Sequence, residues 1–108
     1  MLKKKERLTR KAFDRSFSVG KRYHSPVLQL IYDPSDSFHG AAVVGKKVYK
    51  KAVDRNTLRR RLYGVLYRFA QATQAKGTFI FIAKPKMRER THREVLQDAQ
   101  ALLEEVSM

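Results

Sequence analysis

A dense basic segment, residues 46–68, carries the kinds of side chain that bind phosphate groups. Lysine and arginine recur through the segment, and Asp54 is the only acidic residue between Asp36 and Glu89. Arginine grips a phosphate through two parallel N–H donors, while lysine supplies a compact positive charge. A helix face that only needed to be solvated would mix charges of both signs, because like charges repel. The segment therefore indicates a surface that meets a polyanion, and nucleic acid fits it best.

The later part of this segment has the spacing of an amphipathic helix. An apolar stripe repeats at i, i+4, i+7 and i+8 and consists of Leu58, Leu62, Val65, Leu66 and Phe69. The adjoining face, at about 100° per residue, gathers Arg55, Asn56, Arg59, Arg60, Tyr63 and Tyr67. Arg61 and Arg68 fall further round the helix. Tyrosines on such a face can stack on unpaired bases.

The candidate nucleic-acid-binding residues combine the cations of the segment with polar side chains of this helix. They are Lys46, Lys47, Lys51, Arg55, Asn56, Arg59, Arg60, Tyr63 and Arg68. The competing interpretation is a solvated helix whose arginine stems lie along apolar surface with their charged ends in water. That interpretation is disfavoured because the segment lacks the carboxylates such a face normally carries.

A pair of aromatic residues near the N-terminus is a second candidate feature. Phe13 and Phe17 are one helical turn apart and share a face. They can line a groove in which single-stranded nucleic acid stacks. They can also be core residues that pack the first helix on a sheet, with Leu8 and Phe13 forming a hydrophobic staple. The sequence alone favours the core interpretation.

The remaining polar residues offer little catalytic chemistry. A second basic cluster follows the last apolar strand (Lys84, Lys86, Arg88 and Arg90), and it is interpreted equally well as solvated charge or as a phosphate contact. His24, His39 and His92 are scattered without metal-ligand spacing, and the chain has no cysteine. No paired acids, Gly-rich phosphate loop or nucleophile elbow is present. The pattern is typical of a binding protein rather than of a stand-alone enzyme.

The N-terminal half predicts a helix followed by strands. A helix with Thr9 as N-cap is expected to end at Gly20. Residues 26–32 and 38–44 are rich in strand formers, and a turn separates them. A short extra strand is expected to continue from the second of these.

The C-terminal half predicts the pattern helix, strand, helix. Asp54 is the expected cap of the central helix, with a start a few residues earlier as the alternative. Residues 78–83 form a short apolar strand, predicted to be buried on both sides. Thr91 and Glu94 have the spacing of a capping box at the start of a last helix. The apolar stripe of that helix is Val95, Leu96, Ala99, Leu102, Leu103 and Val106.

The length and the net charge of the chain limit the possible folds and partners. A chain of 108 residues predicts a single domain (residues 1–108) with a flexible basic arm at 1–7, and its net charge is +14. We expect an α+β fold, a two-layer sandwich whose sheet is covered by helices on one face and partly open on the other. The sequence has no transmembrane run and no secretory signal, so a cytoplasmic protein is expected. A membrane surface is a weak candidate partner, because the central helix needs its apolar stripe for the core.

Residues 45–60 resemble the signature of the bacterial ribonuclease P protein subunit. The matching features are Lys46-Lys47, then Ala52-Val53, and then Arg55-Asn56 followed by Arg59-Arg60. The spacing Phe13-x-x-x-Phe17-x-x-Gly20 and the strand at 79–83 are similar to the family as well, so the resemblance covers nearly the whole chain. It implies the order α-β-β-β-α-β-α, a sheet of about four strands like that of ribosomal protein S5 domain 2, and a left-handed βαβ crossover.

The resemblance also implies a function, which we expect for this chain. The family's protein binds the catalytic RNA of ribonuclease P and helps it remove the 5′ leader of precursor tRNA, an endonucleolytic reaction that uses Mg²⁺ bound by RNA and not by the protein. The expected partners are therefore ribonuclease P RNA and precursor tRNA, with no membrane and no small-molecule substrate. The alternatives are a structural RNA-binding protein with no role in cleavage and a stand-alone nuclease, which the missing acid clusters disfavour.

Individual residues match the family's motifs. Arg55, Asn56, Arg59 and Arg60 match the basic helix motif, Lys46 and Lys47 match the paired lysines, and Phe13 and Phe17 match the aromatics of the leader-binding cleft. Three residues depart from the pattern: Thr57 stands where the family has a second arginine, and Tyr49 and Lys50 stand where glycine and asparagine are common. The strand residues expected to complete the cleft are Leu28, Leu30 or Tyr32.

Overall fold

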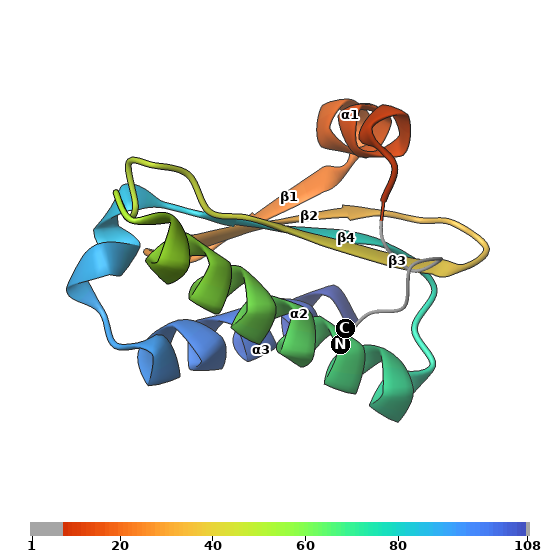
Figure 1. Ribbon diagram of the computed structural model, residues 1–108. Coiled ribbons are helices and arrows are strands. Elements are labelled where there is room, and N and C mark those ends of the chain that lie inside the picture. The colour runs from red at the N-terminus through yellow and green to blue at the C-terminus, as the bar shows by residue number, and fades with distance from the viewer. Residues whose placement is uncertain (1–7, 108) are drawn as a thin grey trace.

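The computed structural model describes residues 8–107 and centres on a four-stranded sheet in the order β1-β2-β4-β3 (Figure 1). The strands are β1 (Lys21–His24), β2 (Leu28–Asp33), β3 (Phe38–Val43) and β4 (Gly77–Ala83). β1 and β2 are antiparallel, as are β2 and β4, whereas β3 runs parallel to β4. The basic arm predicted at 1–7 lies outside the described residues.

Helices cover one face of the sheet fully and the other face in part. The helical elements are α1 (Arg10–Val19), α2 (Ala52–Thr73), the short 3₁₀ helix η2 (Pro85–Glu89) and α3 (His92–Ser107). In Figure 1, α2 and α3 lie together on one side of the sheet and α1 lies on the other. α2 packs under β3, while α3 packs under β2 and β1. The predicted α+β class, element order and partly open sheet face are confirmed.

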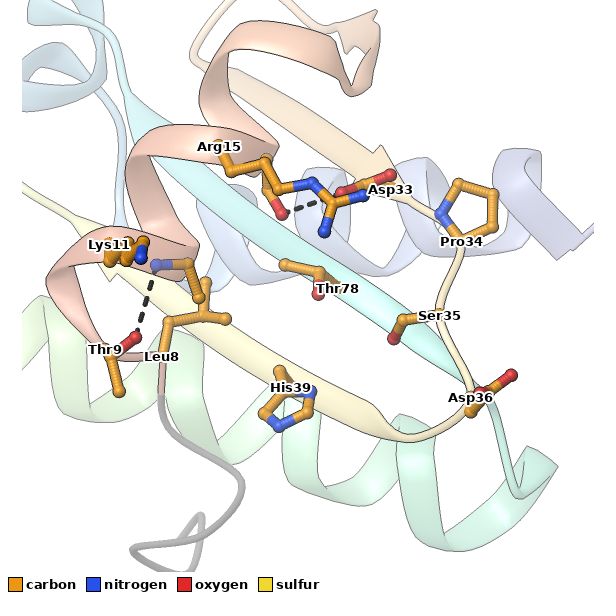
Figure 2. A pocket seen from close by; sticks show the side chains of 12 residues that line it. Leu8, Thr9, Lys11, Arg15, Asp33, Pro34, Ser35, Asp36, His39 and Thr78 are labelled. Atoms are coloured by element: carbon orange, nitrogen blue, oxygen red, sulfur yellow. Dashed lines mark hydrogen bonds between the residues drawn. The ribbon is translucent and has the colours of Figure 1, made fainter.

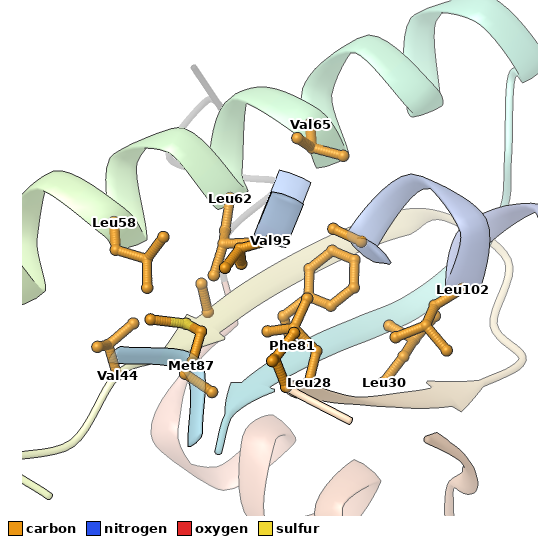
Figure 3. Packing of buried hydrophobic residues seen from close by; sticks show 14 of the residues in the cluster. Leu28, Leu30, Val44, Leu58, Leu62, Val65, Phe81, Met87, Val95 and Leu102 are labelled. Carbon is orange, nitrogen blue, oxygen red and sulfur yellow. The ribbon is translucent and has the colours of Figure 1, made fainter. Parts of the chain in front are cut away.

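The main core lies between the sheet and the α2–α3 layer (Figure 3). Leu58 and Leu62 from α2 are fully buried, as is Phe81 from β4. The predicted stripe of α3 contributes Val95, Ala99, Leu102 and Leu103. Burying an aliphatic or aromatic side chain of this size stabilises a fold by about 1.5–3 kcal/mol. This cluster therefore fixes which face of α2 points at the sheet and which face remains outside.

A smaller cluster lies on the opposite face of the sheet. Ile31, Ala41 and Ile80 are buried there, and Leu8 and Phe13 pack over them. Successive strand residues point to opposite faces, so β4 sends Ile80 to this cluster and Phe79 and Phe81 to the main core. The prediction of a strand buried on both sides is confirmed.

Two of the three predicted helix caps are confirmed, and the third is wrong. Thr9 Oγ1 accepts a hydrogen bond from the Ala12 N–H at 3.2 Å. Thr91 and Glu94 bond each other's backbone N–H reciprocally, at 3.0 and 3.2 Å. Asp54, however, lies within the first turn of α2, because the helix begins at Ala52 with Lys51 as its N-cap. An acid in the first turn is favourable through the helix dipole, which is why its position resembled a cap.

The extra strand lies elsewhere than predicted. β1 follows Gly20 directly, whereas the residues after β3 form a turn in which the Val48 N–H donates to the Gly45 carbonyl. β1 is an edge strand with mostly exposed side chains, and only Tyr23 packs toward the main core. Its sequence, Lys-Arg-Tyr-His, lacks a run of strand-forming residues, so its pairing with β2 decides the conformation.

Gly20 ends α1 as predicted, but for a different reason. Its φ is −69°, so it does not adopt the left-handed conformation of a typical helix-terminating glycine. A Cβ at this position would lie 2.7 Å from the Ser16 carbonyl oxygen and closer still to the Ile31 Cγ2 atom. The residue therefore lets α1 approach β2.

We predict that Gly20→Ala lowers the free energy of unfolding by about 1–3 kcal/mol, the usual cost of overpacking. Gly45→Ala is the matched control, because a Cβ there meets nothing within 4 Å. Urea unfolding of both variants is the measurement. Equal midpoints for the two variants would contradict the role of Gly20 in helix–sheet packing.

Candidate nucleic-acid interface

The sequence left open whether the two phenylalanines of α1 are core residues or groove residues, and they differ in burial. Their ring centroids are 5.9 Å apart and the rings are stacked. Phe13 is half-buried over the small cluster on the open sheet face, whereas Phe17 is 39% exposed. Arg22 lies with its guanidinium carbon 4.7 Å from the Phe17 ring centroid and donates to the Phe17 carbonyl oxygen. Phe13 thus packs on the small cluster without being fully buried, and Phe17 presents an aromatic surface to the outside.

A row of side chains crosses the open face of the sheet beside α1. In the strand register His24 pairs with Gln29, Gln29 with Ile82, and Ile82 with Val43. Ile82 packs at the margin of the small cluster and Val43 is 36% exposed. These four residues, with Phe17, provide a partly apolar strip for an extended chain.

The strand residues suggested from the sequence point the other way. Leu28 and Leu30 are fully buried in the main core, and Tyr32 packs against the same core. Strand alternation therefore gives the open face to Gln29 and Ile31 of β2. The sequence could not show this, because β2 is apolar at residues of both faces and does not mark which face α1 leaves open.

An open groove at the β3 edge connects Phe13 to the basic helix. Its volume is about 570 Å³, and its lining includes Phe13 from α1, Val43 from β3 and Tyr63 from α2. β3 ends the sheet on this side, with α1 over one of its faces and α2 under the other. The edge strand therefore brings the two candidate features together, although they come from helices on opposite sides of the sheet.

The basic face of α2 and the preceding loop carry charge without carboxylate partners. Most of the predicted cations here are exposed: Lys46, Lys47, Lys51 and Arg60. In the part of the chain that the structure describes, ion pairs join only Arg10 to Asp14 and Arg90 to Glu94. The field of this face is therefore directed at solvent or at a partner.

Arg55 and Arg59 help to shape this surface. Arg55 Nη1 donates to the carbonyl oxygens of Tyr49 and Lys50, at 2.9 and 2.7 Å. It thereby ties the loop that carries the lysines to the first turns of α2. Arg59 donates to the Asn56 side-chain oxygen, so these two motif residues are joined to each other.

Arg68 is not brought together with the other candidate residues. It lies toward α3, in a groove that Arg61 and Arg93 also line. Thr57, which replaces a motif arginine, donates its hydroxyl to the Val53 carbonyl oxygen at 2.9 Å. Its side chain is thus turned back onto its own helix.

A partly buried contact joins the basic loop to α3. The Tyr49 hydroxyl lies 3.4 Å from the His92 Nε2 atom. Burial lowers the pKa of His92, Arg61 lowers it further, and Asp54 opposes the change. Burial also raises the pKa of the Tyr49 hydroxyl, and Asp54 raises it further. Both pKa shifts favour the neutral forms of the two side chains where the loop meets the two helices.

Another hollow, which no sequence pattern indicated, has a volume of about 790 Å³ and lies on the other flank of α1 (Figure 2). Lys11 and Arg15 line it from α1, and Asp33, Asp36 and His39 line it from the sheet and the β2–β3 loop. The Ser16 hydroxyl donates to Asp33 Oδ2 at 2.9 Å. Cations and acids are mixed in this hollow, unlike the basic face of α2 and the preceding loop, where the exposed cations have no carboxylate partner among the described residues.

The second basic cluster is partly used within the fold. Lys84 Nζ donates to the Ser25 carbonyl oxygen, and Arg90 forms an ion pair with Glu94. Lys86 and Arg88 are exposed on η2.

Within residues 8–107 no three His, Asp or Glu side chains gather as a metal-ion site. No helix in that range is long and apolar enough to span a bilayer.

Comparisons with known proteins agree on one family. The ribonuclease P family model matches residues 2–107. A ribonuclease P protein component from a Nitratiruptor species is 31% identical, covering 91% of this chain and 88% of its own. The protein of the same name from Microcystis aeruginosa is 33% identical, covering 87% of this chain and 83% of its own.

Two solved structures show the same fold at lower identity. The ribonuclease P protein of Staphylococcus aureus has a TM-score of 0.73 at 17% identity, with 94% of each chain covered. The ribonuclease P protein of Thermotoga maritima has a TM-score of 0.72 at 23% identity, covering 93% of this chain and 96% of its own.

The hydrogen bonds of Arg55 predict a stability difference between two motif arginines. Arg55→Gln should lower the free energy of unfolding by about 1–2 kcal/mol, because two carbonyl groups lose a charged donor. Arg60→Gln should change it by less than about 0.5 kcal/mol, as expected for an exposed side chain. Urea unfolding of both variants tests the difference, and equal midpoints would show that Arg55 does not tie the loop to α2.

Proposed function

The chain belongs to the ribonuclease P protein family, and from that premise we propose that it is the protein subunit of ribonuclease P. It binds the catalytic RNA through the basic face of α2 and the 5′ leader of precursor tRNA through the cleft beside α1. The observation that carries the proposal is the groove at the β3 edge, which joins Phe13 and Val43 to Tyr63. One surface can thus hold the leader strand next to the RNA that cleaves it.

The basic face supplies the contact with the catalytic RNA. Lys46, Lys47, Lys51 and Arg60 are exposed and lack carboxylate partners among the described residues. Each phosphate that they neutralise releases counterions, so affinity should fall steeply with salt, by a log–log slope of about 0.7–0.9 per contact. Arg59 and Asn56 add donors and acceptors whose geometry is set by their mutual bond.

The cleft supplies the contact with the leader. Phe17 offers an exposed ring on which an unpaired base can stack. The strip that crosses the sheet through Gln29, Ile82 and Val43 offers a surface for the next nucleotides. Arg22 lies against Phe17 and places a positive charge beside that ring. Stacking on an aromatic ring suits every base, so the proposed contact reads a single strand rather than a sequence.

The protein's contribution to cleavage is to position the substrate. Mg²⁺ held by the RNA subunit and the substrate would supply the metal chemistry of phosphodiester hydrolysis. The side chains of this chain would hold the leader and shield the repulsion between two RNA backbones. Both effects should matter most where Mg²⁺ is scarce, because there the cations of the protein take over part of the screening.

Reconstitution tests this function. Purified protein is added to a bacterial ribonuclease P RNA and precursor tRNA at low Mg²⁺ and near-physiological salt, and leader release is followed. We expect rapid cleavage with the protein and very slow cleavage with RNA alone. If the protein binds the RNA and leaves cleavage unchanged, the chain is a structural RNA-binding protein. Cleavage by the protein without an RNA subunit would instead establish a stand-alone nuclease.

Phe17 gives a residue-level prediction. In the reconstituted enzyme, Phe17→Ala should weaken binding of precursor tRNA about tenfold, since base–aromatic stacking contributes about 1–3 kcal/mol per base. Binding of mature tRNA, which lacks the leader, should not change. Val19→Ala is the control, because Val19 is an exposed apolar residue of the same helix. An equal loss for precursor and mature tRNA would contradict a leader contact.

A further inference from the structure

Gly64 occupies a position at which nothing in the protein requires glycine. It lies in the middle of α2, and its φ is not positive. A Cβ built there would meet only the Arg68 Nη1 atom, at 3.5 Å, which is an ordinary contact. Glycine in a helix interior costs about 1 kcal/mol relative to alanine. The fold therefore carries a destabilising residue that its own packing does not explain.

The neighbours of Gly64 on the helix surface are arginines. Arg60, Arg61 and Arg68 are at i−4, i−3 and i+4, the positions that adjoin residue i on a helix. The main chain at Gly64 is therefore a partly exposed patch that is bordered by three arginines and, at i+3, by Tyr67. Glycine is the residue that permits close approach of a partner to a backbone.

This patch borders a groove between α2 and α3. The groove has a volume of about 330 Å³, and Arg61, Arg68 and Arg93 line it from the two helices. Leu96 forms part of its wall, and Gln97 and Gln100 add neutral donors and acceptors. No carboxylate lines this stretch, whereas the adjoining stretch toward the C-terminus includes Glu104. Arg68 lines both stretches, so the cationic part of the groove ends at this residue.

The groove is separate from the proposed leader cleft. α2 and α3 lie on the face of the sheet opposite α1 (Figure 1), and Arg61 and Arg68 are on the side of α2 that faces α3. Arg93 belongs to α3 and to no motif noted in the sequence. Arg61, Arg68 and Arg93 form no ion pair with another described residue. These charges are thus left to an external anion.

We propose that Gly64 and the arginines Arg61, Arg68 and Arg93 form a second docking site for an RNA sugar–phosphate backbone. The strand crosses α2 at the partly exposed main chain of Gly64 and places phosphates against the arginines of the groove. Arg61 and Arg68 are about 10 Å apart along the helix axis at 1.5 Å per residue, so their side chains can reach different phosphates of one strand. The inference rests on the proposed function and adds a second RNA contact on another face.

The test separates stability from binding. Gly64→Ala should raise the melting temperature by about 4–8 °C, the change expected for a helix-favouring substitution in a domain of this size. The same change should weaken binding of ribonuclease P RNA at least about threefold, and Gly64→Leu should weaken it more. Gln71→Ala, on the same side of α2 two turns away, should leave the affinity unchanged.

The arginines give an independent measurement. The double variant Arg61→Gln/Arg93→Gln should reduce the salt slope of RNA binding by about 1.5, the contribution of two phosphate contacts. Arg60→Gln is the control for RNA binding by the proposed basic face. A synthetic polyglutamate competes in parallel, and equal effects of the variants on RNA and on polyglutamate would overturn the assignment to RNA.

The outcomes distinguish this inference from the proposed function. If Gly64→Ala stabilises the protein without changing affinity, and the arginine double variant keeps its slope, the second site does not exist. If Arg60→Gln still weakens binding in that experiment, the proposed function stands. If neither the unmodified protein nor any variant binds ribonuclease P RNA, both fail.

Discussion

The burial of β4 on both of its faces is the constraint on which the rest of the structure depends. Phe79 and Phe81 require a helix layer on one side, and Ile80 requires cover on the other. α2 and α3 meet the first need and α1 meets the second. Because β3 is the edge strand beside β4, the start of α1 and the middle of α2 reach the same margin of the sheet from opposite sides. The interface follows from how this strand is covered.

What matters about the charge of the chain is where the charged side chains lie in the fold. A net charge of +14 opposes compaction, yet no charged side chain is buried among the residues that the structure describes. Several cations form hydrogen bonds within the protein. Arg55 donates to two carbonyl oxygens of the loop, and Lys84 donates to the Ser25 carbonyl oxygen. Others remain exposed along α2 and its preceding loop. This division separates cations that build the surface from those that remain exposed and lack a carboxylate partner among the described residues.

Much of the fold could be predicted from the sequence, because it is encoded locally. The Thr9 cap, the capping box at Thr91 and the apolar stripes of α2 and α3 depend on spacings of three and four residues. β1 could not be predicted, since its conformation comes from pairing with β2. The face of β2 that lines the cleft was also predicted wrongly, because an apolar strand does not record which of its sides α1 will leave open.

The candidate site was likewise predicted only in part. The composition of residues 46–68 identified the basic surface, but helical periodicity alone could not show that Arg68 turns toward α3. That placement depends on Arg93, which is distant in sequence and lies in another helix. The structural use of Arg55 was hidden too, because the carbonyl groups it binds belong to a loop without regular structure. Long-range packing decides these features, and no local pattern reports it.

The central claim is that the strip beside α1 holds the leader, and site-directed crosslinking tests it most directly. The chain has no cysteine, so Val43→Cys and Glu105→Cys each provide one attachment point for a photoreactive group, at the cleft and on α3. In the reconstituted complex with precursor tRNA, the account predicts crosslinks from residue 43 to leader nucleotides and none to the leader from residue 105. Leader crosslinks from residue 105, with none from residue 43, would contradict it.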